Sequence, residues 1–124
     1  MKPKDTASIN ENSDINFQDG LDACNKGDYK TAIDKWEALA NQGYAKAQSK
    51  LGWIYASGTG VPKNDEQAAE WLLKAANQGY AKAQYNLGKM YQNGIGVLKD
   101  DEQAAEWLLK AANQNHAIAQ NNLG

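Results

Sequence analysis

Apolar residues recur along most of the chain with the spacing of amphipathic α-helices, and turn residues separate the helices into pairs. The first helix of a pair has small and large apolar residues on one face, spaced i, i+4, i+5 and i+8: Ala47, Leu51, Gly52 and Tyr55. The second helix has a stripe rich in alanine and leucine, which includes Trp71. Both patterns return 36 positions later. The sequence therefore predicts an all-α chain built from repeated helix pairs.

The repeat defines the organisation of the chain. About 25 of the 36 aligned positions are identical between the two copies. The chain divides into a polar, aperiodic leader expected to be disordered (1–14), a shorter helix pair (15–44), two repeats (45–80 and 81–116), and the start of a further repeat or a terminal capping helix (117–124).

Turn and capping residues predict the helix ends. Asn64 and Asp100 stand where an N-cap belongs. Gly79 fits the position just after a helix end, and its counterpart in the next copy is Asn115. We expect the second helices to end at these two residues and a new helix to begin at Ala117.

The repeated motifs resemble those of the Sel1-like repeat family, a relative of the tetratricopeptide repeat. The pattern is Ala-x-x-x-Leu-Gly-x-x-Tyr, then Gly-x-Gly-Val and Asp, then Ala-Ala-x-x-Trp and Lys-Ala-Ala-x-x-Gly. It runs from Ala47 to Gly79 and again from Ala83 to Ala112, whereas the first pair departs from it with the turn Gly27-Asp28-Tyr29. The resemblance implies a right-handed α/α superhelical solenoid whose concave face, lined by the first helices, holds peptides or protein domains. Family members act as adaptors in bacterial signalling, host interaction and quality control.

Composition narrows the function classes. All 13 basic residues are lysine and the net charge is −2, which argues against a nucleic-acid binder because no arginine fork is present. No apolar run approaches the roughly 18 residues of a spanning helix, so we expect no membrane insertion. Cys24 and His116 are single, so we expect no disulfide, metal site or cofactor. Of the four tryptophans, we place Trp36, Trp71 and Trp107 at one repeated position in a core between repeats.

Candidate catalytic groups are few. His116 lies one or two repeats away from every serine in the predicted helices. The glycine pairs that begin at Gly58 and Gly94 lack the preceding strand and the lysine–serine ending of a phosphate-binding loop. We therefore expect no enzyme, with a hydrolase as the least favoured of the alternatives.

The variable positions of the two repeats predict a contact surface. The copies differ at Ser49 and Tyr85, Trp53 and Lys89, Ala56 and Gln92, and Ser57 and Asn93. The predicted partner-binding residues of the concave face are Lys46, Ser49, Trp53, Ala56, Ser57, Lys82, Tyr85, Lys89, Gln92 and Asn93. Trp53 and Tyr85 are the candidate anchors, because aromatic residues dominate binding energy at interfaces. The alternative for Trp53 is packing on a neighbouring repeat.

The sequence thus predicts a non-enzymatic protein–protein interaction adaptor that holds a peptide or a partner protein in the groove of the first helices. The alternative is a scaffold that self-assembles end to end through the uncapped segment 117–124. The polar leader contains no hydrophobic stretch of a signal peptide, which favours the cytoplasm. Export with removal of a leader is the alternative location.

Overall fold

The chain forms a stack of helices. The computed structural model describes residues 11–123, and the surroundings of the side chains for residues 12–115. This part of the chain contains six helices and no strand: α2 (Glu11–Asn25), α3 (Tyr29–Asn41), α4 (Ala45–Ser57), α5 (Asp65–Asn77), α6 (Ala81–Asn93) and α7 (Asp101–Leu123).

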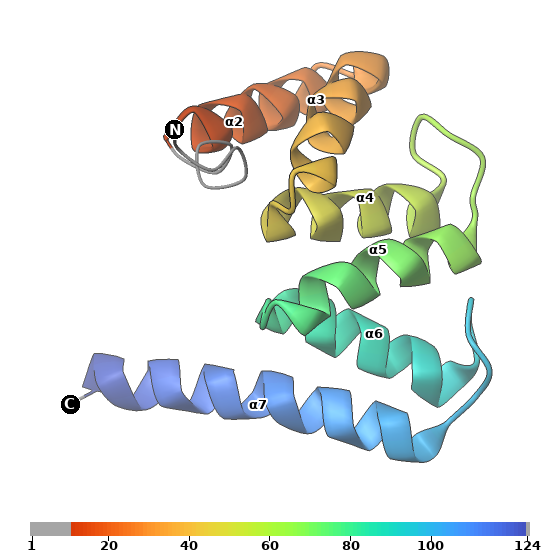
Figure 1. The fold of residues 1–124 in the computed structure, drawn as a ribbon, viewed down its shortest axis with the longest axis vertical. Coiled ribbons are helices and arrows are strands. Elements are labelled where there is room, and N and C mark those ends of the chain that lie inside the picture. Colours follow the sequence, from red (N-terminus) through yellow and green to blue (C-terminus); the bar gives the residue numbers. More distant parts are fainter. Residues whose placement is uncertain (1–10, 124) are drawn as a thin grey trace, which may run out of the picture.

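Each helix packs mainly on its neighbours in the sequence. The closest partners are α2 with α3, α4 with α5, and α6 with α7, and the pairs are joined through α3 with α4 and α5 with α6. Figure 1 shows the helices following one another along the long axis, with α2 at one end and α7 at the other. The predicted all-α solenoid of helix pairs is confirmed, because packing mainly between neighbouring helices is typical of a solenoid.

Tryptophans of the second helices form the core between successive pairs. Trp71 of α5 is 8% exposed and joins a cluster made by α2, α3 and α4, and Trp107 of α7, also 8% exposed, joins the cluster of α5 and α6. Lys74 and Lys110 place their ammonium groups 4.6 Å from the centroids of these rings. The prediction that these two tryptophans lie between repeats is confirmed.

Within each pair, a glycine of the first helix allows a bulky side chain of the second helix to approach closely. The three contacts are Gly20 with Trp36, Gly52 with Leu72, and Gly88 with Leu108. A Cβ atom at position 52 would lie 2.6 Å from Leu72 Cγ, and one at position 88 would lie 2.8 Å from Leu108 Cγ. These distances are shorter than normal contacts. The two helices of each pair can therefore pack this closely only because glycine has no side chain at these positions.

These contacts correct the predicted position of Trp36. Trp36 occupies the place of Leu72 and Leu108, not that of Trp71, which is one residue out of phase with it. The indole of Trp36 is fully buried, in a core cluster that also contains residues of α4, and its Nε1–H donates to the Phe17 carbonyl at 3.3 Å. The repeat position predicted for Trp36 was wrong by one residue, because tryptophan here fills the space that leucine fills in the later repeats.

The predicted helix starts are confirmed. The side-chain oxygens of Asn64 and Asp100 accept hydrogen bonds from the backbone N–H groups of Gln67 and Gln103, at 3.0 and 3.1 Å. These bonds satisfy donors that a helix N-terminus otherwise leaves free.

The predicted helix end at Asn115 is wrong. Gly79 has the expected left-handed conformation, with φ 90°, whereas α7 continues through Asn115 to Leu123 as one helix. Among the described residues, only glycines have positive φ. Asparagine in place of glycine therefore supplies no stop, and Figure 1 shows α7 running past the end of α6.

The boundary between leader and first pair also shifts. Helix α2 begins at Glu11, inside the segment predicted to be disordered. Its first turns are held by polar contacts: Ser13 is 2% exposed, and Asp14 accepts a hydrogen bond from the Tyr44 hydroxyl. Polar residues with buried partners give no apolar periodicity. For that reason the hydrophobic pattern did not predict the first turn of α2. The rest of the predicted leader, residues 1–10, lies outside the described residues.

Candidate functional site

The first helices of the three pairs border a cavity of about 340 Å³. We call it the basic cavity. Its lining residues come from α2, α4 and α6 and from the residue before α6: Phe17, Leu21, Lys46, Ser49, Lys50, Trp53, Tyr80, Lys82 and Asn86. The second helices connect each pair to the next one (α3 to α4, and α5 to α6), which leaves this space between the first helices.

Lys50 is the most confined charge in the basic cavity. It is half-buried, and its Nζ lies 5.0 Å from the centroid of the Trp53 ring and 5.8 Å from that of Trp36. Burial lowers the pKa of Lys50 below its usual value, and the positive charge of Lys82 lowers that pKa further, while Cys24 acts in the opposite direction. The two lysines, from α4 and α6, therefore act on each other across the space between their helices.

A second cavity of about 340 Å³ adjoins the first at Trp53. We call it the apolar cavity. Its lining residues are Gly52, Trp53, Ala56, Lys63, Asp65, Leu72, Asn86, Met90 and Ile95. Lys63 and Asp65 pair with each other, so the charges in this cavity balance locally. The Trp53 side chain, 45% exposed, thus stands between a basic and an apolar space.

The structure brings half of the predicted contact residues to these cavities. Lys46, Ser49, Trp53, Ala56 and Lys82 line one or both of them. The others line neither cavity: Ser57, Tyr85, Lys89, Gln92 and Asn93, all of which are exposed.

Two of the predicted serines are poorly placed for partner contact. Ser49 was expected at the surface of the groove, but it is only 7% exposed at the wall of the basic cavity. The Ser57 hydroxyl lies 3.3 Å from the Ile54 carbonyl and 2.7 Å from the Thr59 hydroxyl. Its hydrogen bonds are therefore made locally, at the C-terminal end of α4. Trp53 is 45% exposed and lines both cavities, so it is the predicted residue best placed for contact.

Sequence reasoning missed Lys50 and Asn86. Both occupy one repeated position, at which the two copies differ, so the criterion that selected Trp53 and Lys89 applied equally to them. Phe17 and Tyr80 also line the basic cavity, and Phe17 packs against the core cluster as well. Phe17 serves both, because its ring lies 6.0 Å from that of Trp36.

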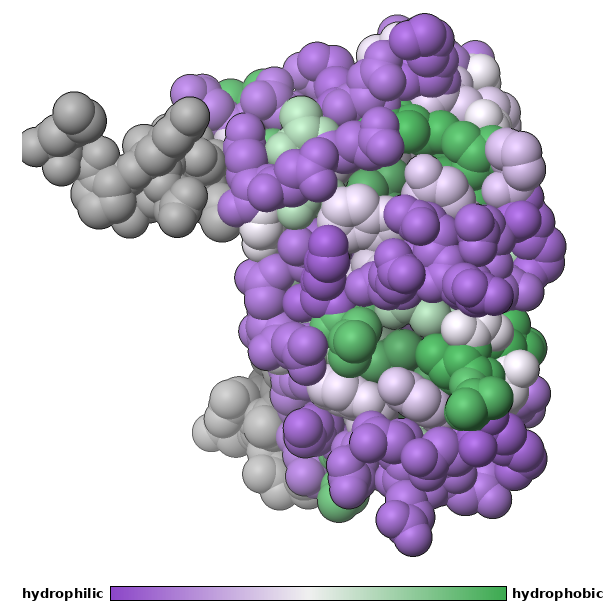
Figure 2. Space-filling model, turned by 45° about the vertical axis from the view of Figure 1, so that its right-hand side comes forward, coloured by the Kyte–Doolittle hydropathy of each residue, from purple (hydrophilic) through white to green (hydrophobic). Residues whose placement is uncertain are grey.

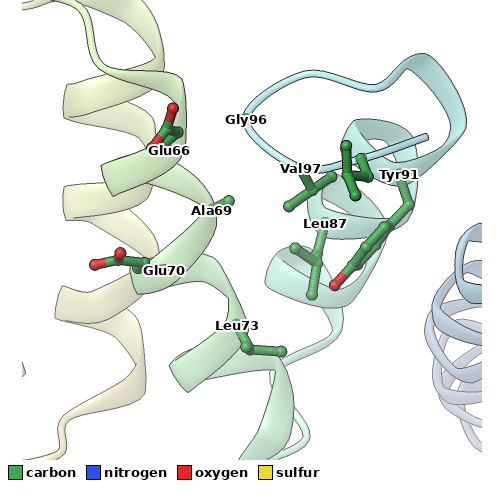
Figure 3. Close-up of a pocket in the computed structure, with 9 residues that line it drawn as sticks. Glu66, Ala69, Glu70, Leu73, Leu87, Tyr91, Gly96 and Val97 are labelled. Carbon is green, nitrogen blue, oxygen red and sulfur yellow. The ribbon is translucent and has the colours of Figure 1, made fainter. Parts of the chain in front are cut away.

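A third, larger cavity of about 500 Å³ lies between α5 and the loop after α6. In Figure 3, Ala69 and Leu73 of α5 point toward Leu87 and Val97, whereas Glu70 points away from them. Figure 2, which brings the side of the inter-helix loops forward, shows hydrophobic surface in a hollow between hydrophilic bands. Leu98, at the rim of this cavity, is 90% exposed. The one aromatic residue that lines this cavity, Tyr91, is half-buried, whereas Trp53 is 45% exposed. We call this third space the comparison cavity.

The described part of the chain offers neither a metal site nor a membrane-spanning helix. No three His, Cys, Asp or Glu side chains gather there into a group that could hold a metal ion. None of the helices in that part is long and apolar enough to cross a membrane. The candidate site is accordingly the pair of adjoining cavities around Trp53.

The sequence matches one family model. The model of the Sel1 repeat matches residues 45–80 and 81–116, which together make up more than half of the chain. No curated protein matches the chain.

Solved structures of repeat proteins are similar to the chain. A Sel1 repeat protein from Oxalobacter formigenes is 40% identical with a TM-score of 0.76, and the match covers 86% of this chain and 44% of that one. A protective antigen present in uropathogenic Escherichia coli strains, displaying an SLR fold, is 31% identical with a TM-score of 0.79, covering 90% of this chain and 25% of that one. The chain thus spans less than half the length of these two proteins.

A more distant structure has nearly the same extent. Cysteine rich protein B of Helicobacter pylori is 20% identical with a TM-score of 0.68, and the match covers 83% of this chain and 88% of that one. At this identity the likeness concerns the fold alone.

Proposed function

The chain belongs to the Sel1 repeat family, and we propose that it is a non-enzymatic adaptor that binds a peptide segment of a partner protein along its first helices. Sel1 repeat proteins generally mediate protein–protein interactions. The binding surface in this proposal is the groove formed by the basic cavity and the apolar cavity.

The observation that carries the proposal is the position of Trp53. A tryptophan that is 45% exposed leaves apolar surface in water, although the two cavities beside it have a combined size suited to several side chains. Tryptophans in such positions dominate the binding energy of interfaces, because they fill pockets that exclude water on association. The helix pairs beneath supply a rigid base, since Gly52 packs closely on Leu72.

Affinity capture from a bacterial lysate with matched variants tests this proposal. Trp53→Ala should lose the partner that the wild-type protein retains, while the helix content measured by circular dichroism stays unchanged, because Trp53 is 45% exposed and belongs to neither buried core cluster. Leu98→Ala is the matched control, since it removes a more exposed apolar side chain beside the comparison cavity. Equal recovery by the wild type and Trp53→Ala would contradict the proposal, and loss with Leu98→Ala alone would move the site to the other cavity.

Light scattering at several concentrations separates the adaptor from the self-assembling scaffold. An adaptor should keep one mass over the whole range. A mass that grows with concentration would favour end-to-end assembly instead.

A further inference from the structure

The groove changes in character along its length. Toward the N-terminal ends of α4 and α6 lie Lys46, Lys50 and Lys82, whereas toward the C-terminal ends lie Ala56 and Met90. Trp53 stands between these halves because it lines both cavities. A bound segment would therefore meet positive charge on one side of the tryptophan and apolar surface on the other.

The positive charge of the basic cavity is not balanced by its own walls. Three lysines line it, and none of its lining residues is acidic, although the whole chain has more acidic than basic residues. Among the described residues, the lysines in ion pairs are Lys30, Lys63 and Lys99, none of which lines this cavity. The composition of the chain therefore does not explain the excess of positive charge in the basic cavity.

Resting on the proposed function, we propose that the groove selects an acidic segment of its partner: an aspartate or glutamate side chain enters the basic cavity between Lys50 and Lys82, and an apolar side chain enters the apolar cavity across Trp53. The carboxylate completes a site that the protein leaves with positive charge only. Trp53 contacts both side chains and thereby sets the spacing between them.

The environment of Lys50 supports this choice of ligand. Its ammonium has aromatic faces at 5.0 and 5.8 Å as its nearby partners, which stabilise a cation less than a carboxylate does at contact distance. Burial and the charge of Lys82 both lower its pKa, so the free groove holds its positive charge at some cost. A carboxylate placed between the two ammonium groups offsets that cost through its opposite charge, and a cationic or neutral segment does not.

The shape and the other side chains favour a peptide over a polynucleotide. The groove is bordered by α2, α4, α5 and α6, and its apolar half offers no cation for a phosphate chain except Lys63, which is paired with Asp65. The chain contains no arginine, the residue whose planar fork suits phosphate recognition. A short acidic stretch next to an apolar side chain fits both halves.

Selection from a phage-displayed library of short random peptides tests the inference. Selected sequences are synthesised with acetylated and amidated ends, so that side chains are the only source of carboxylates, and their affinities are measured by fluorescence anisotropy. The expected binders carry Asp or Glu near an apolar residue. Replacing that Asp or Glu with its amide, or Lys50 with Met, should weaken binding by about tenfold or more.

Three controls separate the possible failures. Lys110→Met removes a lysine of α7 that lines none of the three cavities, and should leave affinity unchanged. Binders that need Trp53 but show no acidic preference would overturn this inference and leave the proposed function intact. The same holds if a selected sequence binds only when it is synthesised with a free C-terminal carboxylate. A single-stranded oligothymidylate that binds as tightly as the selected peptides would also overturn it. A selection that yields no binder dependent on Trp53 would contradict the proposed function and this inference together.

Discussion

Adding one methyl group at Gly52 tests how the helix pairs are held together. A Cβ atom at this position would lie 2.6 Å from Leu72 Cγ and 2.7 Å from Leu72 Cδ2. Leu72 is only 3% exposed, so its side chain cannot turn out into solvent to make room. Gly52→Ala therefore forces either α4 and α5 apart or Leu72 into an unfavourable rotamer.

Two opposing effects determine the change in stability. Alanine stabilises a helix interior by about 0.5–1 kcal/mol relative to glycine. Overpacking a well-packed core costs about 1–3 kcal/mol. The steric cost is the larger, so we expect Gly52→Ala to lower the free energy of unfolding by about 1 kcal/mol.

The sign of the effect should reverse when Leu72 is removed. Leu72→Ala alone should cost about 2–5 kcal/mol, because it leaves a cavity between α4 and α5. In that background the new methyl group meets no side chain and partly fills the cavity, so Gly52→Ala should stabilise the protein. Urea unfolding of the four proteins, followed by far-ultraviolet circular dichroism, gives this double-mutant cycle. Equal destabilisation by Gly52→Ala in both backgrounds would refute the steric explanation.

The other pairs provide internal comparisons for the same substitution. At Gly88 the corresponding contact with Leu108 is slightly longer, at 2.8 Å, and Leu108 is half-buried, so Gly88→Ala should cost less than Gly52→Ala. At Gly20 the neighbour is the fully buried ring of Trp36, which cannot adapt, so Gly20→Ala should cost most. A different order in the unfolding midpoints would contradict the packing account.

Three further predictions concern individual side chains. Burial, aided by the hydrogen bond to Asp14, raises the pKa of Tyr44 to about 12 from 10.0. The stability that neutral Tyr44 contributes should therefore be fully present below pH 10 and fall as the pH rises toward 12. Tyr44→Phe should remove this pH dependence from unfolding curves recorded in alkaline solution. Lys82→Gln should raise the pKa of Lys50 toward its usual value, which NMR titration of the Lys50 side chain measures, and an unchanged pKa would show that the two charges do not interact. Asn64→Ala should cost about 1 kcal/mol in thermal unfolding through loss of the N-cap of α5, and no loss would show that the cap contributes nothing.

Local signals in the sequence were sufficient for most of the fold. The N-caps Asn64 and Asp100 and the left-handed Gly58 and Gly94 each depend on residues within one turn, so the residue types specify them. The predictions were wrong where a tertiary contact, or the absence of a residue that ends a helix, determined the structure. Trp36 takes the place of a leucine within its pair, and α7 continues where Asn115 replaces a glycine.

The candidate site was only partly predictable from the sequence. Helical spacing indicates which residues of α4 leave the core, and this found Lys46 and Trp53. Spacing within one helix does not specify how neighbouring pairs are rotated relative to each other. Spacing alone therefore does not distinguish Tyr85, which lines neither cavity, from Lys50, which lines one.

Site-specific photo-crosslinking tests the central claim most directly. A photoreactive lysine analogue replaces Lys46, which lines the basic cavity, or Lys110 on α7, so that the two probes are chemically matched. The account predicts that the partner crosslinks through position 46 and not through position 110, and that Trp53→Ala abolishes the crosslink. Crosslinking through position 110 alone, or a crosslink at position 46 that persists without Trp53, would contradict it.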